Sequence, residues 1–213
     1  MNRALESIDS RLCDYIESEI IPRYRTFDKA HSEKHARQVI AQSLSLAKHY
    51  ETEAAMVYTI AAYHDLGLTA GRERHHIVSG EILRADNTLR TFFRDEQIEL
   101  MAEAVEDHRA SLGHEPRSIY GRIVAEADRL IDPMTVVRRT IQYSLSHYPT
   151  LSVEEHFERC TTHLREKYGR GGYLQLWIPE SDNATRLECL RQTIEQEAEL
   201  RHLFDKIYNE ESR

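Results

Sequence analysis

The sequence predicts an all-α protein, and two observations support this fold class. Apolar residues recur at intervals of three and four along most of the chain, which is the spacing of one face of an α-helix. Residues that interrupt helices are few, because the 213 residues include only 8 glycines and 5 prolines. Apolar residues make up 40% of the chain, enough to form a buried core, so we expect a folded protein rather than a disordered one.

The first half of the chain is expected to contain five helices. The third is apolar on almost every side, as a central buried helix would be, and Gly67 follows it where helices often end. Asp95 is a suitable N-terminal cap for the fifth. The apolar patterns that mark these helices cover residues 5–20, 31–47, 52–66, 75–83 and 95–105.

Four further helical stretches are expected, at residues 118–130, 133–145, 152–168 and 181–208. The last two are separated by a glycine-rich segment, residues 169–172, which no strand precedes, so we interpret it as a connector rather than a dinucleotide-binding loop. The chain shows no internal repeat, linker or low-complexity segment. We therefore expect one all-α domain over residues 1–213.

Charge and composition exclude several classes of function. The chain has 36 acidic and 28 basic residues, a net charge of −8, and so lacks the basic surface of a general nucleic-acid binder. Its longest mostly apolar stretch, residues 54–63, is half of what a membrane span needs. The N-terminal residues are charged where a signal peptide would be apolar, and three cysteines lie far apart in no metal-binding spacing. We expect a cytoplasmic protein.

Polar residues on apolar helix faces point to a metal site. His108 and Asp128 continue the apolar stripes of their helices, and His64 and Asp65 close the most apolar helix of the chain. A buried carboxylate is costly unless a cation or an arginine neutralises it. Imidazole and carboxylate groups together suit Mn, Mg, Co, Fe, Zn or Ni better than a metal that prefers thiolates.

The order of His35, the His64-Asp65 pair and Asp128 along the chain resembles the His…His-Asp…Asp signature of the HD-domain superfamily of metal-dependent phosphohydrolases. The resemblance covers about residues 28–140 and leaves a helical C-terminal extension at 141–213. Its motifs are Asp28, His31, His35 and Val39, then Tyr63 to Gly67, then Glu126 to Leu130. It implies a helical bundle in which the ligands of a divalent cation converge.

The resemblance implies His35, His64, Asp65 and Asp128 as metal ligands, with His31 as the fallback ligand. Relatives that bind two metals place two more histidines between the His-Asp pair and the last aspartate. His76 and His108 could fill these places, but His76 lies only 11 positions after Asp65. We therefore expect one metal, with His76 and His108 lining the substrate cleft.

The implied activity is hydrolysis of a nucleotide or another small phosphate ester by a metal-activated water. Asp65 would orient the water, and His108 or Arg72 would stabilise the phosphate charge. Two alternatives stay open: a di-iron oxygenase of the same fold, which would use His76 and His108, and a non-catalytic module that binds a metal or a nucleotide. We expect a small phosphate-bearing molecule as the partner, neither nucleic acid nor a membrane, and leave a homodimer open.

Overall fold

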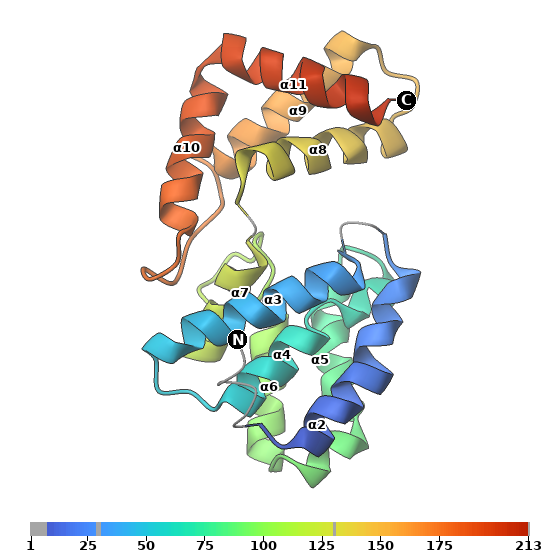
Figure 1. Ribbon diagram of the computed structural model, residues 1–213, viewed down its shortest axis with the longest axis vertical. Helices are drawn as coiled ribbons and strands as arrows, with labels where there is room; N and C mark the ends of the chain where they lie inside the picture. The colour runs from blue at the N-terminus through green and yellow to red at the C-terminus, as the bar shows by residue number, and fades with distance from the viewer. Residues whose placement is uncertain (1–7, 29–30, 130, 213) are drawn as a thin grey trace. The chain divides into compact units, whose positions relative to one another are not determined.

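The computed structural model describes residues 8–28, 31–129 and 131–212. Every regular element in these ranges is helical, which confirms the predicted fold class. Leu5 and Leu130, which the sequence analysis placed in helices, lie outside the described residues. The α-helices are α2 (Ser10–Tyr15), α3 (Glu33–Leu46), α4 (Ala54–Tyr63), α5 (His75–Ala85), α6 (Asp95–Glu106), α7 (Ile119–Asp128), α8 (Pro133–His147), α9 (Val153–Tyr168), α10 (Asn183–Glu195) and α11 (Glu197–Glu211) (Figure 1).

The chain forms two compact units. The first contains the residues up to Asp128 together with Trp177–Ser181, and the second contains Arg129–Leu176 and the residues from Asp182 onward. The sequence analysis expected a C-terminal extension from residue 141, whereas the second unit begins at Arg129. The single-domain organisation stays a prediction.

Helix α4 forms the centre of the first unit, as its sequence predicts. All of its residues from Met56 to Tyr63 are buried, and α3, α6 and α7 pack against it. Its last residue leads directly into His64 and Asp65, which are themselves buried. The most apolar helix of the chain therefore fixes the position of the His-Asp pair.

Gly67 allows α5 to approach the end of α4. A Cβ atom at Gly67 would lie 2.1 Å from the carbonyl oxygen of His75, so any other residue would clash with the backbone of α5. The Gly67 N–H also donates a hydrogen bond to Ser79 Oγ at 2.8 Å. These contacts hold the first turn of α5 beside the His-Asp pair.

The first predicted helix is interrupted in the structure. Helix α2 ends at Tyr15 and continues as a π-helical turn, Ile16–Ile20, and a 3-10 turn, Ile21–Thr26. Pro22 lies in the first turn of the 3-10 segment, where its missing N–H costs no helical hydrogen bond. The helical structure therefore continues past the proline at which we expected the helix to end. Further 3-10 turns among the described residues lie at Ala47–His49, Leu66–Ala70 and Asn87–Thr91.

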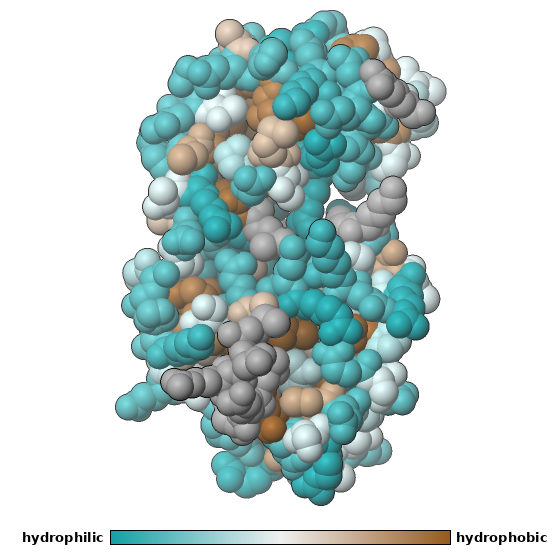
Figure 2. Space-filling view, viewed as in Figure 1, coloured by the Kyte–Doolittle hydropathy of each residue, from teal (hydrophilic) through white to brown (hydrophobic). Residues whose placement is uncertain are grey.

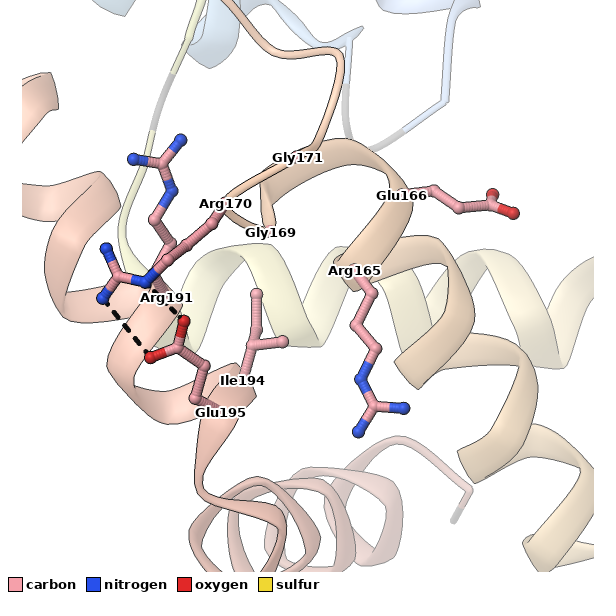
Figure 3. Close-up of a pocket in the computed structure, with 8 residues that line it drawn as sticks. All are labelled: Arg165, Glu166, Gly169, Arg170, Gly171, Arg191, Ile194 and Glu195. Carbon is pink, nitrogen blue, oxygen red and sulfur yellow. Dashed lines mark hydrogen bonds and ion pairs between the residues drawn. The ribbon is translucent and has the colours of Figure 1, made fainter.

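The second unit consists of α8 to α11. The predicted helix over residues 181–208 is two helices, because the backbone of Gln196 leaves the helical region with φ −96° and ψ 88°. The break lets α11 pack against α8 while α10 packs against α9. The surface carries a groove of about 620 Å³ at the end of α9, where Arg170 pairs with Glu195 (Figure 3).

The face in Figure 2 is mostly hydrophilic, with apolar residues in small separate areas. No helix among the residues in 8–28, 31–129 and 131–212 has both the length and the apolar character that spanning a bilayer requires.

Candidate metal centre

Six polar side chains from five helices of the first unit converge at the ends of those helices. His35 lies on α3, His64 and Asp65 follow α4, and His75 is the first residue of α5. His108 lies in the turn after α6, and Asp128 is the last residue of α7. Five of the six residues are largely buried, and the Asp128 side chain is 28% exposed.

His35, His64 and Asp65 form a first group with ligand atoms close enough to share one cation. The Nε2 atoms of His35 and His64 lie 3.3 Å apart, and Asp65 Oδ2 lies 3.1 Å from His64 Nε2. Asp128 Oδ1 is 3.1 Å from His35 Nε2 and 3.8 Å from His64 Nε2. The structure therefore brings together the four side chains that the sequence analysis expected as ligands.

Asp65, His75 and His108 form a second group of the same kind. The Nε2 atoms of His75 and His108 lie 3.1 Å apart, and each is 3.5 Å from Asp65 Oδ1. Asp65 thus offers Oδ2 to the first group and Oδ1 to the second. One carboxylate joins two clusters of imidazoles.

Hydrogen bonds to backbone carbonyls orient three of these imidazoles. Nδ1 of His64 donates to Ala61 O at 2.8 Å, and Nδ1 of His108 donates to Val105 O at 2.6 Å. Nδ1 of His75 donates to Arg72 O at 2.8 Å. Because each Nδ1 carries the proton, a neutral ring presents the lone pair of Nε2 to the cluster, which is the tautomer that binds a metal.

The geometry between His75 and His108 favours a proton or a metal ion. Two Nε2 lone pairs 3.1 Å apart would repel one another unless a proton or a metal ion lies between them. The donor set also fits a divalent cation chemically, since it mixes imidazole nitrogens with carboxylate oxygens. The residues present therefore match the metal that the motif implies.

The charges of the centre follow from burial and from the two carboxylates. Burial, together with the neighbouring His108, lowers the pKa of His75 to about 4, so this imidazole is neutral at pH 7. Burial also opposes a charge on His35, but hydrogen bonds to Asp128 and Asp65 outweigh it and raise the pKa of His35 to about 9. Burial likewise opposes the charge on Asp65, yet the surrounding imidazoles hold its pKa well below the usual value.

The structure brings His75 rather than His76 to Asp65. The sequence analysis named His76, together with His108, as a residue that could fill the place of a further histidine and did not name His75. In the structure His75 is the residue that begins α5, next to Gly67, and so it points back toward the end of α4. His76 is buried beside it, with the two ring centroids 5.6 Å apart.

His31 and Arg72 lie beside the centre rather than in it. The His31 ring meets the His35 ring edge-on, with centroids 6.0 Å apart, and His31 Nδ1 is 2.7 Å from Asp28 Oδ1. Arg72 Nη2 lies 3.3 Å from Asp28 Oδ2 and 3.4 Å from His31 Nδ1, and its side chain is 54% exposed. Arg72 therefore has the exposure that contact with a substrate requires.

Two supporting residues had no signal in the sequence. Tyr24 is fully buried, donates to Ala62 O at 2.9 Å and accepts from the Asp65 N–H at 3.3 Å, so it holds the backbone of the His-Asp pair. Arg109 Nη1 donates to Glu73 O at 2.5 Å and so ties the loop before His75 to the turn that carries His108. A tyrosine in a 3-10 turn and an arginine in a loop follow no recognisable spacing.

Comparison with known proteins agrees with this geometry. The family model of the HD domain matches residues 33–131, a range that contains all six converging side chains. No curated protein and no solved structure matches the chain. HD domains bind divalent metals, and the two groups around Asp65 could hold them. Residues 33–131 therefore match the HD-domain family, in agreement with the resemblance that the sequence motifs carry.

Proposed function

We propose that the protein is a metal-dependent phosphohydrolase that acts on a nucleotide or another small phosphate ester. The observation that carries this proposal is Asp65, whose two carboxylate oxygens face separate pairs of histidines. The match of residues 33–131 to the HD domain supports the same class of activity.

We propose two divalent cations where the sequence analysis expected one. His35, His64 and Asp128 would hold the first, His75 and His108 the second, and Asp65 would bridge them. His108 then serves as a ligand rather than as a free group that contacts phosphate. Four imidazoles favour Mn, Fe, Co, Ni or Zn over Mg, which prefers oxygen ligands.

Cations held here would lower the pKa of a bound water and neutralise charge on a phosphoryl group. The chain itself would orient that water through the Asp65 carboxylate, which the imidazoles keep ionised. Arg72 would bind a phosphate oxygen, since a guanidinium offers several donors in one plane. The Asp28 carboxylate accepts a hydrogen bond from Arg72 and so orients the guanidinium beside His31, next to the metal centre.

A di-iron oxygenase is the second candidate, and the same observation favours it. A carboxylate between two sets of histidines suits two irons as well as two redox-inert cations. The two functions differ in what they consume. Two irons per chain with substrate-dependent O₂ uptake would support the oxygenase, whereas release of inorganic phosphate without O₂ uptake would support the phosphohydrolase.

The test combines metal analysis with an activity screen. The purified protein is stripped with EDTA, reloaded with each metal in turn, and assayed with p-nitrophenyl phosphate and a set of nucleotides. We expect phosphate release that requires a divalent cation, best with Mn or Co, and that falls in Asp128→Asn. His202→Ala, which removes an exposed histidine of the second unit, is the matched control. Full activity of the stripped protein without added metal would contradict the proposal.

A further inference from the structure

A short segment that lies far beyond the HD motifs in the sequence packs against the metal-binding unit. Residues Trp177–Ser181, here named the strap, have no regular secondary structure and group with the first unit. The match to the HD domain ends at residue 131, so the strap lies outside the region that defines the family. The first unit is therefore completed by a piece of chain that returns from between α9 and α10.

The strap is attached to α7 through the carboxylate of Glu126. Glu126 is 0% exposed, and its two oxygens accept hydrogen bonds from different ends of the strap. The backbone N–H of Trp177 donates to Oε2 at 2.7 Å, and Ser181 Oγ donates to Oε1 at 2.5 Å. A buried carboxylate is stable only when such donors satisfy it, so these bonds depend strongly on geometry.

Apolar contacts hold the strap in the same place. Ile178 is 3% exposed and belongs to the apolar core of the first unit, and Trp177 packs against that core. At the outer edge of the strap, Tyr50 donates to Glu180 at 2.5 Å. The strap is thus held by these contacts in addition to its hydrogen bonds with Glu126.

Glu126 lies two residues before Asp128, in the last turn of α7. Two residues correspond to about 200° around a helix, so the two carboxylates point to different sides. The strap holds one side of this turn while Asp128 faces the metal centre. The ends of short helices open readily, and α7 has only 10 residues.

We propose that Glu126 and the strap are positioning elements that fix the last turn of α7 and thereby the Asp128 carboxylate. This inference rests on the proposed metal centre. It means that the second unit is connected to the centre at two points of the chain, directly after Asp128 and through the strap.

The experiment compares the Zn²⁺ affinity of strap variants by competition with a chromophoric chelator. Ser181→Ala removes one donor to Glu126, Ser181→Thr keeps a hydroxyl, and Glu126→Gln removes the charged acceptor. Ser118→Ala is the matched control, because Ser118 Oγ accepts from the Gly121 N–H at 3.2 Å at the opposite end of the same helix. The emission of Trp177, the only tryptophan in the chain, monitors the strap in the same samples.

We expect Ser181→Ala and Glu126→Gln to bind Zn²⁺ about tenfold or more weakly, as changes next to metal ligands usually do. Their Trp177 emission should shift to the red, Ser181→Thr should bind nearly as tightly as the natural protein, and Ser118→Ala should keep its affinity even where its melting temperature falls. If Glu126→Gln does not fold, Ser181→Ala alone decides the question.

Wild-type Zn²⁺ affinity in Ser181→Ala would overturn the inference, whether or not the emission of Trp177 shifts. This result would leave the proposed function intact. Absence of Zn²⁺ binding by the natural protein would overturn both the proposed function and the inference, so the two failures are distinguishable.

Discussion

The two units of the chain share one use of charged groups and differ in another. In both units arginines pair with carboxylates at the surface, as Arg84 does with Glu99 in the first unit and Arg170 does with Glu188 in the second. Among the described residues, the groups of histidine and aspartate that could hold a metal lie in the first unit alone. A surface ion pair neutralises itself, whereas a cluster of imidazole lone pairs and carboxylates favours a cation. This difference favours the first unit as the place of the chemistry.

Buried histidines sharpen this comparison. In the second unit, His156 is buried, and its Nδ1 lies 2.7 Å from Ser144 Oγ. His75 and His108 are also held through Nδ1, but their Nε2 atoms face one another. Burial therefore does not identify a site by itself. Convergence of lone pairs on one point does.

The largest expected effect comes from the residue that joins both groups. Asp65→Asn keeps the shape of the side chain but removes the charge that both cations would share, so we expect loss of both metals. Phosphate release should fall on the order of 100-fold or more, since changes to ligands exceed the 10–100-fold of changes around them. Metal analysis and the phosphatase assay measure this. Retention of full activity in Asp65→Asn would show that the cluster in the first unit does not carry the activity.

Asp128→Asn is expected to have a smaller effect, because Asp128 faces the first group only. Metal affinity should fall by about tenfold or more. The metal-free variant should lose stability, because burial and repulsion by Asp65 oppose the Asp128 charge less than the hydrogen bond and attraction to His35 favour it. Calorimetric unfolding with and without EDTA tests this. An unchanged or raised melting temperature in the metal-free variant would show that repulsion between Asp65 and Asp128 outweighs the contact with His35.

The stability of the metal-free protein should depend on pH through His35. Its pKa is about 9 in the folded protein against 6.5 ordinarily, so the stabilising charge is present below pH 6.5 and is lost as pH rises toward 9. The lowered pKa values of Asp65 and Asp128 add stability that is present above their ordinary value of 3.8 and is lost as pH falls further. Melting curves of the EDTA-treated protein from pH 3 to 10 check both limits. A flat profile between pH 6.5 and 9 would contradict this charge distribution.

His156→Ala should affect stability and leave the metal centre unchanged. The truncation leaves Ser144 without its imidazole partner, and we expect a loss of about 1–3 kcal/mol in the free energy of unfolding. Metal content and phosphatase activity of the folded variant should match those of the natural protein. Loss of bound metal in this variant would show that the two units do not divide structure and chemistry as proposed.

The smallest effect is expected at the surface pairs of the second unit. Arg170→Ala breaks ion pairs with Glu188 and Glu195, all of them exposed to solvent and therefore screened. We expect no measurable change in melting temperature at physiological salt and no change in metal content. A clear drop in melting temperature would mean that these pairs act as a network.

Helical periodicity was sufficient to predict the fold class, and the resemblance to the HD-domain superfamily predicted that His35, His64, Asp65 and Asp128 would form one set. Neither was sufficient for His75, because the choice between adjacent histidines depends on the residue at which α5 begins. That residue is set by contact of α5 with Gly67, which lies outside the helix. The strap escaped prediction for a similar reason, since Glu126 meets partners about 50 residues away whose pairing no local pattern records.

The central claim is that Asp65 bridges two metal ions, and metal stoichiometry tests it most directly. The EDTA-treated protein, His75→Ala and His76→Ala are each reloaded with Mn²⁺, freed of excess metal and analysed for metal per chain. We predict two ions for the natural protein, about one for His75→Ala, and two for His76→Ala. One ion per chain in all three proteins would contradict the two-metal centre, and loss of an ion only in His76→Ala would show that His76 is the ligand.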